Sequence, residues 1–303
     1  MKAIFVDKNI SGNYIRIKRI PIPDILNNEI LIKVKAVGLN PVDWKGIEYN
    51  IFKKPYILGS DFSGVAVKVG KKIKKYKKGD KVIGSLEWLK QGACAEYIVT
   101  KEMYIYKKPL NISLLKSASI PLASLTAWQS LFKELNLKKG QKIFITAGAG
   151  GVGLFAIQFA KWKGAYVYTS ASKKNHKFLY NIGADEILDY TNTSSFNKIK
   201  DLDCVLDSVS MKSTLFKVLK KGGKYLSING KPTSEDLEGY DILAKHFLFH
   251  SDSKDLGQIV KLIGKGTIKV VVDKYFNIKH FKKALKYQKK GHSKGKNILL
   301  IDF

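Results

Sequence analysis

Short apolar runs separated by turn residues make up most of the first 110 residues. The runs at 30–37, 63–69, 81–84 and 93–99 predict strands, because Gly and Pro residues punctuate this part of the chain. Residues 1–7 predict one more strand, at the edge of a sheet. This part of the chain is therefore expected to form a β-rich unit.

Beyond Ser113 the pattern changes to an alternation of strands and helices that continues to about Gly264. We predict helices at 122–135, 152–163 and 174–182, and strands at 142–147, 165–169, 203–208 and 224–228. Such alternation favours an α/β fold with a parallel sheet and helices on both faces. A helix at 278–289 precedes a strand at 297–301, which is expected to return to the first unit.

The most informative motif lies in the segment that joins the strand at 142–147 to the next helix. Its residues match the spacing G-x-G-x-x-G, and they are Gly148, Gly150, Gly151, Val152 and Gly153 with the intervening Ala149. A strand that runs through glycines into a helix lets backbone N–H groups approach a pyrophosphate, helped by the helix dipole. The motif predicts a dinucleotide site, and a tight connection without ligand is the alternative.

The residues after the second strand of this unit favour NADPH over NADH. An NAD site usually has an acidic residue about 20 positions after the first glycine, where it binds the ribose 2′-hydroxyl. Here Ser170, Ser172, Lys173 and Lys174 occupy that region, and no acidic residue lies between Gly148 and Asp185. Hydroxyl and ammonium groups suit a 2′-phosphate, although two lysines carry less weight in a chain so rich in them.

Composition limits the class of protein. A chain of 303 residues, 45% of them hydrophobic, can bury two cores. The net charge of +29 would suit nucleic acid or an anionic membrane, yet Arg16 and Arg19 are the only arginines among 54 basic residues. Lysines are spread almost evenly, whereas phosphate-binding surfaces concentrate charge and use arginine. We therefore expect any binding to nucleic acid to be non-specific.

The two cysteines, Cys94 and Cys204, cannot form a disulfide framework or a four-cysteine zinc site. No signal peptide is evident at the start of the chain. The longest uncharged run, 143–160, contains the four glycines of the nucleotide motif and could not span a bilayer. A cytoplasmic protein without membrane contacts is expected.

Six blocks along the chain together resemble the medium-chain dehydrogenase/reductase superfamily, in its zinc-independent quinone oxidoreductase branch. They are GLNPVDWK (38–45), LGSDFSG (58–64), KGDKV (78–82), AEY (95–97), PLASLTAWQ (121–129) and the glycine loop. The resemblance covers nearly the whole chain. It implies a GroES-like domain at 1–115, completed by 266–303, beside a Rossmann domain at 116–265. It also implies reduction of quinones or α,β-unsaturated carbonyls with NADPH.

A catalytic zinc is not expected. Zinc-dependent relatives place a cysteine where this chain has Pro41-Val42-Asp43, and Gly-His-Glu where it has Gly59-Ser60-Asp61. No histidine precedes His176, and a zinc site needs about three N or S ligands. Asp43, Asp61 and Glu96 are therefore interpreted as partners for lysines or backbone groups. His246 and His250 have a metal-like spacing, but we expect both on a sheet-edge strand.

The resemblance assigns catalytic roles to Asn40 and Lys45, which should lie at the nicotinamide and its ribose. Lys45 could also stabilise negative charge on the substrate. The alternative is that Lys45 is one more surface lysine without a role in the reaction. Thr126 should bind the carboxamide or the ribose, unless it is an ordinary helix residue.

Further contacts rest on position alone. For the cofactor they are Tyr190, Asp207, Val209, Asn229 and Lys296, the last of which could reach the pyrophosphate. Ser210 stands where family members commonly have glycine, so its loop is expected to differ. Substrate contacts are expected from Tyr49, Ile51 and Trp88.

Two other functions stay open at this point: a nucleic-acid binder that retains the dinucleotide fold, and a crystallin-like protein with little turnover. The resemblance also implies a homodimer, joined through an edge strand of the Rossmann sheet near 247–249.

Overall fold

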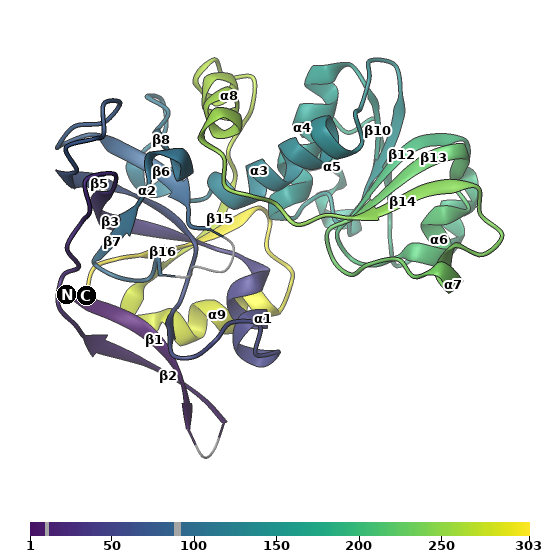
Figure 1. Cartoon of the computed structure of the whole chain (residues 1–303). Coiled ribbons are helices and arrows are strands. Elements are labelled where there is room, and N and C mark those ends of the chain that lie inside the picture. The colour runs from purple at the N-terminus through teal and green to yellow at the C-terminus, as the bar shows by residue number, and fades with distance from the viewer. Residues whose placement is uncertain (10–11, 88–91) are drawn as a thin grey trace. The chain divides into compact units, whose positions relative to one another are not determined.

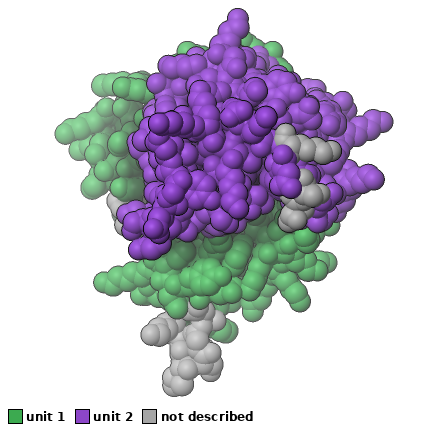
Figure 2. Space-filling model, turned by 90° about the vertical axis from the view of Figure 1, so that its right-hand side faces the viewer, with its two compact units in different colours: residues 1–125, 250–266, 270–303 green, residues 126–249, 267–269 purple. Residues whose placement is uncertain are grey.

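The computed structural model describes residues 1–9, 12–87 and 92–303, and it divides the chain into two compact units (Figures 1 and 2). Unit 1 contains Met1–Leu125, His250–Gly266 and Val270–Phe303, and unit 2 contains Thr126–Phe249 and Thr267–Lys269. No helix within the described residues combines the length and apolar character needed to cross a bilayer.

Unit 1 is built on two sheets. The smaller sheet has the order β2-β1-β4, with strands β2 (Gly12–Arg19), β1 (Lys2–Asn9) and β4 (Tyr56–Ile57). The prediction of an edge strand for residues 1–7 was wrong, because β1 pairs on both sides. Ala3, Ile4 and Val6 are completely buried there, which explains the apolar character of this segment.

The larger sheet of unit 1 brings the two ends of the chain together. Its order is β15 (Val272–Asn277), β16 (Lys296–Leu300), β3 (Ile30–Leu39), β5 (Asp61–Val69), β6 (Lys81–Ser85) and β8 (Ile105–Lys107), and β7 (Tyr97–Thr100) pairs with β3. The predicted return of the last strand is confirmed, because β16 pairs antiparallel with β3. The predicted strand at 93–99 is shorter, since only Tyr97–Thr100 pairs as β7.

Four helices of unit 1 are α1 (Pro41–Glu48), α2 (Leu114–Ser117), α8 (Ser253–Gly264) and α9 (Phe281–Lys289). Helix α8 lies outside the range first expected for this unit. It belongs to unit 1, where the side chain of Asn111 donates to the carbonyl of Ile263 at 3.0 Å. Gly257 also faces the Tyr106 ring so closely that an added Cβ would lie 2.7 Å from it.

Unit 2 contains the parallel sheet that the alternating pattern predicts. Its order is β11 (Glu186–Leu188), β10 (Tyr166–Ser170), β9 (Lys142–Ile145), β12 (Leu202–Asp207), β13 (Leu219–Ser227) and β14 (Ile242–His246), and each of these pairings is parallel. Ile143, Phe144 and Val205, on the two central strands, are completely buried, as expected of a parallel sheet covered on both faces.

The helices of unit 2 are α4 (Gly151–Lys163), α5 (His176–Ile182), α6 (Lys212–Phe216) and α7 (Ser234–Leu237). Helix α3 (Pro121–Gln129) continues into a π-helical turn at Ser130–Glu134, and together they match the helix predicted at 122–135. The carboxyl ends of the parallel strands meet at one edge of the sheet, where such folds bind ligands.

Candidate functional site

The glycine loop between β9 and α4 is shaped by close contacts that exclude side chains. A Cβ on Gly148 would lie 2.2 Å from the Thr169 hydroxyl, and one on Gly153 would lie 2.4 Å from the carbonyl oxygen of Ala147. Ala147 itself has a positive φ of 50°. The glycines therefore let the start of α4 approach the ends of β9 and β10, as the motif predicts.

The beginning of α4 fits an anionic group. Gly150 is the N-cap residue, and no side chain caps the helix. The first backbone N–H groups of a helix have no partner within the helix, and the dipole of this 13-residue helix favours negative charge there. The cradle that the glycines leave suits the pyrophosphate of a dinucleotide, and its contact with Gly150, Gly151, Val152 and Gly153 stays a prediction.

The end of β10 carries the group of residues expected at the 2′-phosphate. Ser170 is buried, and its hydroxyl accepts a hydrogen bond from the N–H of Ala147 at 3.2 Å, so it supports the glycine loop. Lys173 and Lys174 are exposed immediately beyond, in a short 3₁₀ turn that Ser172 precedes. The structure thus brings Ser172 and both lysines together at the strand end, and their contact with a phosphate stays a prediction.

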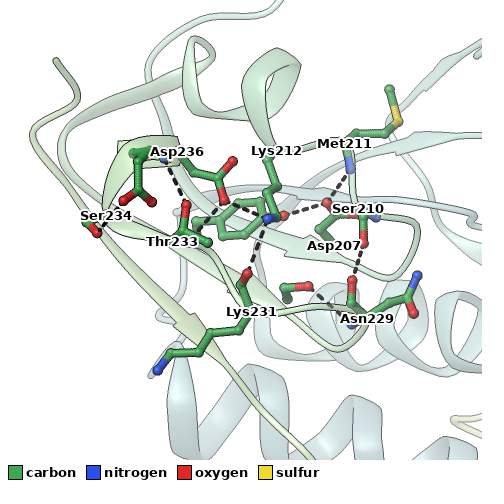
Figure 3. Close-up of polar contacts among 12 residues, drawn as sticks. Asp207, Ser210, Met211, Lys212, Asn229, Lys231, Thr233, Ser234 and Asp236 are labelled. Carbon is green, nitrogen blue, oxygen red and sulfur yellow. Dashed lines mark hydrogen bonds and ion pairs between the residues drawn. The ribbon is translucent and has the colours of Figure 1, made fainter. Parts of the chain in front are cut away.

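Asp207 organises the loop that follows β12 (Figure 3). Its buried carboxylate accepts bonds from the N–H groups of Val209, Ser210 and Met211 at 2.9, 3.1 and 2.7 Å. It also accepts from the Tyr225 hydroxyl at 2.6 Å. These donors occupy the carboxylate, so Asp207 fixes the loop, which leaves Val209 half-exposed at the sheet edge.

Ser210 gives this loop an unusual link. It has a φ of 65°, a left-handed conformation that favours glycine, and its hydroxyl donates to the carbonyl of Asn229 (Figure 3). The bond joins the loop after β12 to the loop after β13. Lys212 adds a second link, because its ammonium lies 3.1 Å from the carbonyl oxygen of Lys231 and 2.6 Å from Asp236.

In unit 1, the residues of the GLNPVDWK block lie where β3 leads into α1. Asn40 is buried before the helix, whereas Lys45 is half-buried on it, with its ammonium 5.8 Å from the centroid of the Trp44 ring. Both protons of the Asn40 amide are donated within the unit, to the carbonyl of Gly38 at 3.1 Å and to Asp61 at 3.0 Å. The amide oxygen accepts from Lys296.

Lys296 does not extend toward solvent, as a residue reaching for a pyrophosphate would. Its side chain is 5% exposed, and its ammonium donates to the carbonyl of Leu39 at 2.8 Å and lies 3.5 Å from Asp61. The interpretation of Asp43, Asp61 and Glu96 as partners of lysines and backbone groups is confirmed. Asp43 accepts from the N–H of Asn40 at 2.7 Å, and Glu96 accepts from that of Lys2 at 2.6 Å.

Burial shifts the pKa values of this unit's charged side chains. Desolvation raises the pKa of Asp43 to about 7, with the bond from Asn40 and the charge of Lys296 opposing the rise. Desolvation also raises the pKa of Asp61 and lowers that of Lys296, and the attraction between the two opposes both shifts. The sequence shows these residue types but not that strand register would bring them together.

The remaining predicted contacts are placed as follows. Thr126 is buried in α3, Tyr190 is half-exposed after β11, and Tyr49 and Ile51 are exposed beyond α1. Trp88 lies outside the described residues. His246 ends the edge strand β14, but the expectation of the same strand for His250 was wrong, because His250 belongs to unit 1.

One group of potential metal ligands exists among the described residues, formed by His250, Asp252 and Asp255. Asp252 is the N-cap of α8, and its carboxylate accepts from the N–H groups of Lys254 and Asp255 at 2.7 and 2.9 Å. Helix capping accounts for its position there.

Two family models match the chain. One, described as an alcohol dehydrogenase GroES-like domain, matches residues 26–110, and the other, described as a zinc-binding dehydrogenase, matches residues 182–299. The description of the second model names zinc. In this chain the residues before His176, which include the segments that align with the zinc ligands of zinc-dependent relatives, contain no histidine.

Among curated proteins, the chain is 32% identical to a chloroplast envelope quinone oxidoreductase homologue of Arabidopsis thaliana, over 93% of this chain and 92% of that protein. It is 33% identical to an NADPH-dependent alkenal/one oxidoreductase of the same plant, over 92% and 74%. Among solved structures, a quinone oxidoreductase from Coxiella burnetii covers the whole of both chains, with a TM-score of 0.89 and 28% identity.

Proposed function

Because the chain belongs to the medium-chain dehydrogenase/reductase superfamily, in its quinone oxidoreductase branch, we propose that it transfers hydride from NADPH to a quinone or an α,β-unsaturated carbonyl. The observation that carries the proposal is the glycine cradle at the start of α4, whose shape excludes every side chain larger than hydrogen at Gly148 and Gly153. The two similar plant proteins, a quinone oxidoreductase homologue and an alkenal/one oxidoreductase, indicate the substrate class.

When bound, NADPH supplies the hydride. The chain's own residues hold and orient it: the start of α4 binds the pyrophosphate, and the residues after β10 bind the 2′-phosphate. The loop that Asp207 fixes presents Val209 at the sheet edge. Orientation of two reactants is a large part of catalysis when the acceptor is already electron-poor.

Lys45 has the clearest chemical role in unit 1. An ammonium beside a carbonyl opposes the negative charge that builds on oxygen as hydride arrives, and such charge stabilisation acts mainly in the transition state. Asn40 is a positioning residue in this account, because its amide groups are used inside unit 1. The segments 41–43 and 59–61, where zinc-dependent relatives have a cysteine and Gly-His-Glu, contain neither cysteine nor histidine here.

We also propose a homodimer formed along β14. This strand is the edge of the unit 2 sheet; Leu243 on the strand is 61% exposed, and Leu248, two residues beyond its end, is 47% exposed. An exposed strand edge with apolar residues is a ready surface for pairing with a second copy. A molar mass in solution of twice 34.0 kDa supports the proposal, and a monomeric mass contradicts it.

The test of the proposed activity is consumption of NADPH with a panel of quinones and enones. We expect turnover with at least one class of acceptor, and a double glycine-loop variant, Gly148→Val with Gly153→Val, should lose it together with NADPH binding. Tight NADPH binding without turnover across the panel would instead support a crystallin-like role. The nucleic-acid alternative is not favoured, given the relatives' activities.

A further inference from the structure

Three adjacent strands of unit 1 bring a buried group of charges to one place. In the register of the large sheet, Gly38 of β3 lies opposite Asp61 of β5, and Leu39 lies opposite Asn297 of β16. Asp61 and Lys296 begin β5 and β16, and Asn40 immediately follows β3, so the three side chains converge at the ends of adjacent strands. Each is almost completely buried.

The contacts fix which way the Asn40 amide points. Its nitrogen faces a carboxylate, Asp61, at 3.0 Å, and its oxygen faces the Lys296 ammonium. Lysine only donates and an ionised carboxylate only accepts. A flipped amide would therefore place its NH2 group against the ammonium and its oxygen against the carboxylate. Asp61 also accepts from the N–H of Leu122 at 2.9 Å, which fixes the carboxylate in turn.

Asn40 is the residue before α1, the helix that carries Lys45. The backbone N–H of Asn40 donates to Asp43, the third residue of that helix, at 2.7 Å. Lys296 also binds the carbonyl of Leu39, the residue before Asn40. The ammonium is thus bonded to two consecutive residues at the point where β3 turns into α1.

We propose that Lys296 and Asp61 are positioning residues that hold the start of α1, and hence Lys45, for the reaction. This inference rests on the proposed function. The resemblance puts the zinc ligands of zinc-dependent relatives in the segments 41–43 and 59–61. Here the Lys296 ammonium pairs with Asp61, the last residue of the second segment, and bonds to Leu39 and Asn40, which immediately precede the first.

The position of Lys45 should therefore depend on a charge far from solvent. Removing Lys296 leaves Asp61 buried without its counter-ion and leaves the Asn40 oxygen without its donor, and removal of one partner of a buried ion pair is strongly destabilising. Removal of both partners restores neutrality but not the bond to Asn40. Stability and catalysis should therefore respond differently to the double change.

The test uses the full chain with Lys296→Met, Asp61→Asn, their double variant, and Lys283→Met as a control at an exposed lysine of the same unit. We expect Lys296→Met to lower Tm by roughly 5–10 °C, and the double variant to lower it by less than the sum of the single changes. The kcat with the best acceptor should fall at least about tenfold in Lys296→Met and stay low in the double variant. The Kd for NADPH should change much less.

A kcat that recovers together with Tm in the double variant would overturn the positioning role, as would a Lys296→Met variant with a kcat within about twofold of wild type. Lys296→Arg, which keeps the charge, should recover more kcat than Lys296→Met if it folds. If wild type and Lys283→Met turn over no acceptor while the Tm effects remain coupled, the proposed function is wrong rather than the ion pair. Additive Tm effects would refute the ion pair itself.

Discussion

Lys45 lies on α1 two residues after the buried Asp43, with its ammonium close to the face of the Trp44 ring. We expect Lys45→Ala to lower kcat/KM by about 10- to 1000-fold, the range for loss of one charged stabiliser. The Kd for NADPH should change much less, because the proposed pyrophosphate site is the start of α4 in the other unit.

Steady-state kinetics of Lys45→Ala beside Lys283→Ala test this expectation, since the second variant removes an exposed lysine of the same unit. Normal turnover of Lys45→Ala would make Lys45 a surface lysine and leave catalysis to positioning alone.

Lys174 is the residue on which the choice of cofactor can be tested. It is exposed just beyond the end of β10, where no acidic side chain stands before Asp185. NADPH should bind at least about tenfold tighter than NADH, which is about 1.4 kcal/mol. Lys174→Ala should narrow that gap with little change toward NADH, whereas Lys163→Ala, at the exposed end of α4, should not. Titration calorimetry of the three proteins with both cofactors gives six dissociation constants, and equal affinities of the wild type for NADPH and NADH would contradict the assignment.

The sequence predicted which residues the candidate site contains better than it predicted what each of them does. The glycines, the missing zinc ligands and the lysines after β10 follow from the sequence, because each depends on local spacing. Lys296 shows the limit. Its Gly-Lys context at the chain's end suggested contact with a phosphate, yet the pairing of β16 with β3 turns its ammonium toward Asn40 and Asp61. That pairing joins residues more than 250 positions apart, and no local pattern encodes it.

At the scale of elements, the start of α1 should make folding stability depend on pH. Burial raises the pKa of Asp43 to about 7. The charge of Lys296 lowers this pKa and the charge of Asp61 raises it. Tyr56 and Cys94 lie close enough for Asp43 to raise their pKa values as well. The native state therefore keeps a proton that the unfolded chain releases near pH 4, and this contribution to stability is lost as pH rises from 4 to 7.

Asp43→Asn removes that titration and retains an acceptor for the Asn40 N–H. The free energy of unfolding of Asp43→Asn, relative to wild type, should therefore rise by up to about 4 kcal/mol between pH 4 and pH 7. Urea unfolding across this range measures it, with Asp24→Asn as the control because the Asp24 side chain is fully exposed. A constant difference between Asp43→Asn and wild type would mean that Asp43 is ionised throughout.

The loop after β12 offers a second test at this scale. Ser210 has a left-handed backbone, which costs a residue other than glycine about 1–2 kcal/mol, and its hydroxyl bond to Asn229 offsets part of that cost. Ser210→Ala keeps the strain and loses the bond, so it should be about 1 kcal/mol less stable than wild type. Ser210→Gly loses both and should lie within about 0.5 kcal/mol of wild type. Equal stability of the two variants in urea unfolding would contradict the strain.

The four inner strands of the unit 2 sheet could be predicted, because they alternate with helices in short local segments. The three-residue edge strand β11 was not predicted, and the edge strand expected near 247–249 is β14, which ends at His246. Unit 1 was harder. Strand β1 proved central because it pairs with β2 and with the two-residue β4, neither of which the apolar pattern singled out. Helix α8 lies in the part of the chain where strands and helices alternate, and its contacts with Tyr106 and Asn111, which are distant in sequence, place it in unit 1.

At the scale of the whole molecule, the two units carry separate parts of the proposed chemistry. Unit 2 has the glycine cradle and the lysines for NADPH, and unit 1 has Lys45 and the buried ion pair behind it. The charge of +29 is spread over both units as lysine, which suits the non-specific attraction of anions better than one nucleic-acid surface. Activity therefore requires both units, and neither should turn over an acceptor alone.

The most direct measurement follows a labelled hydrogen. NADPH deuterated at C4, used as each of its two stereoisomers with the best enone acceptor, reports whether hydride passes from the cofactor to carbon. The account predicts deuterium in the product from one stereoisomer and not the other, at a rate that prior treatment with a chelator does not change. Product without deuterium from either form, or turnover that disappears when a tightly bound zinc is removed, would contradict it.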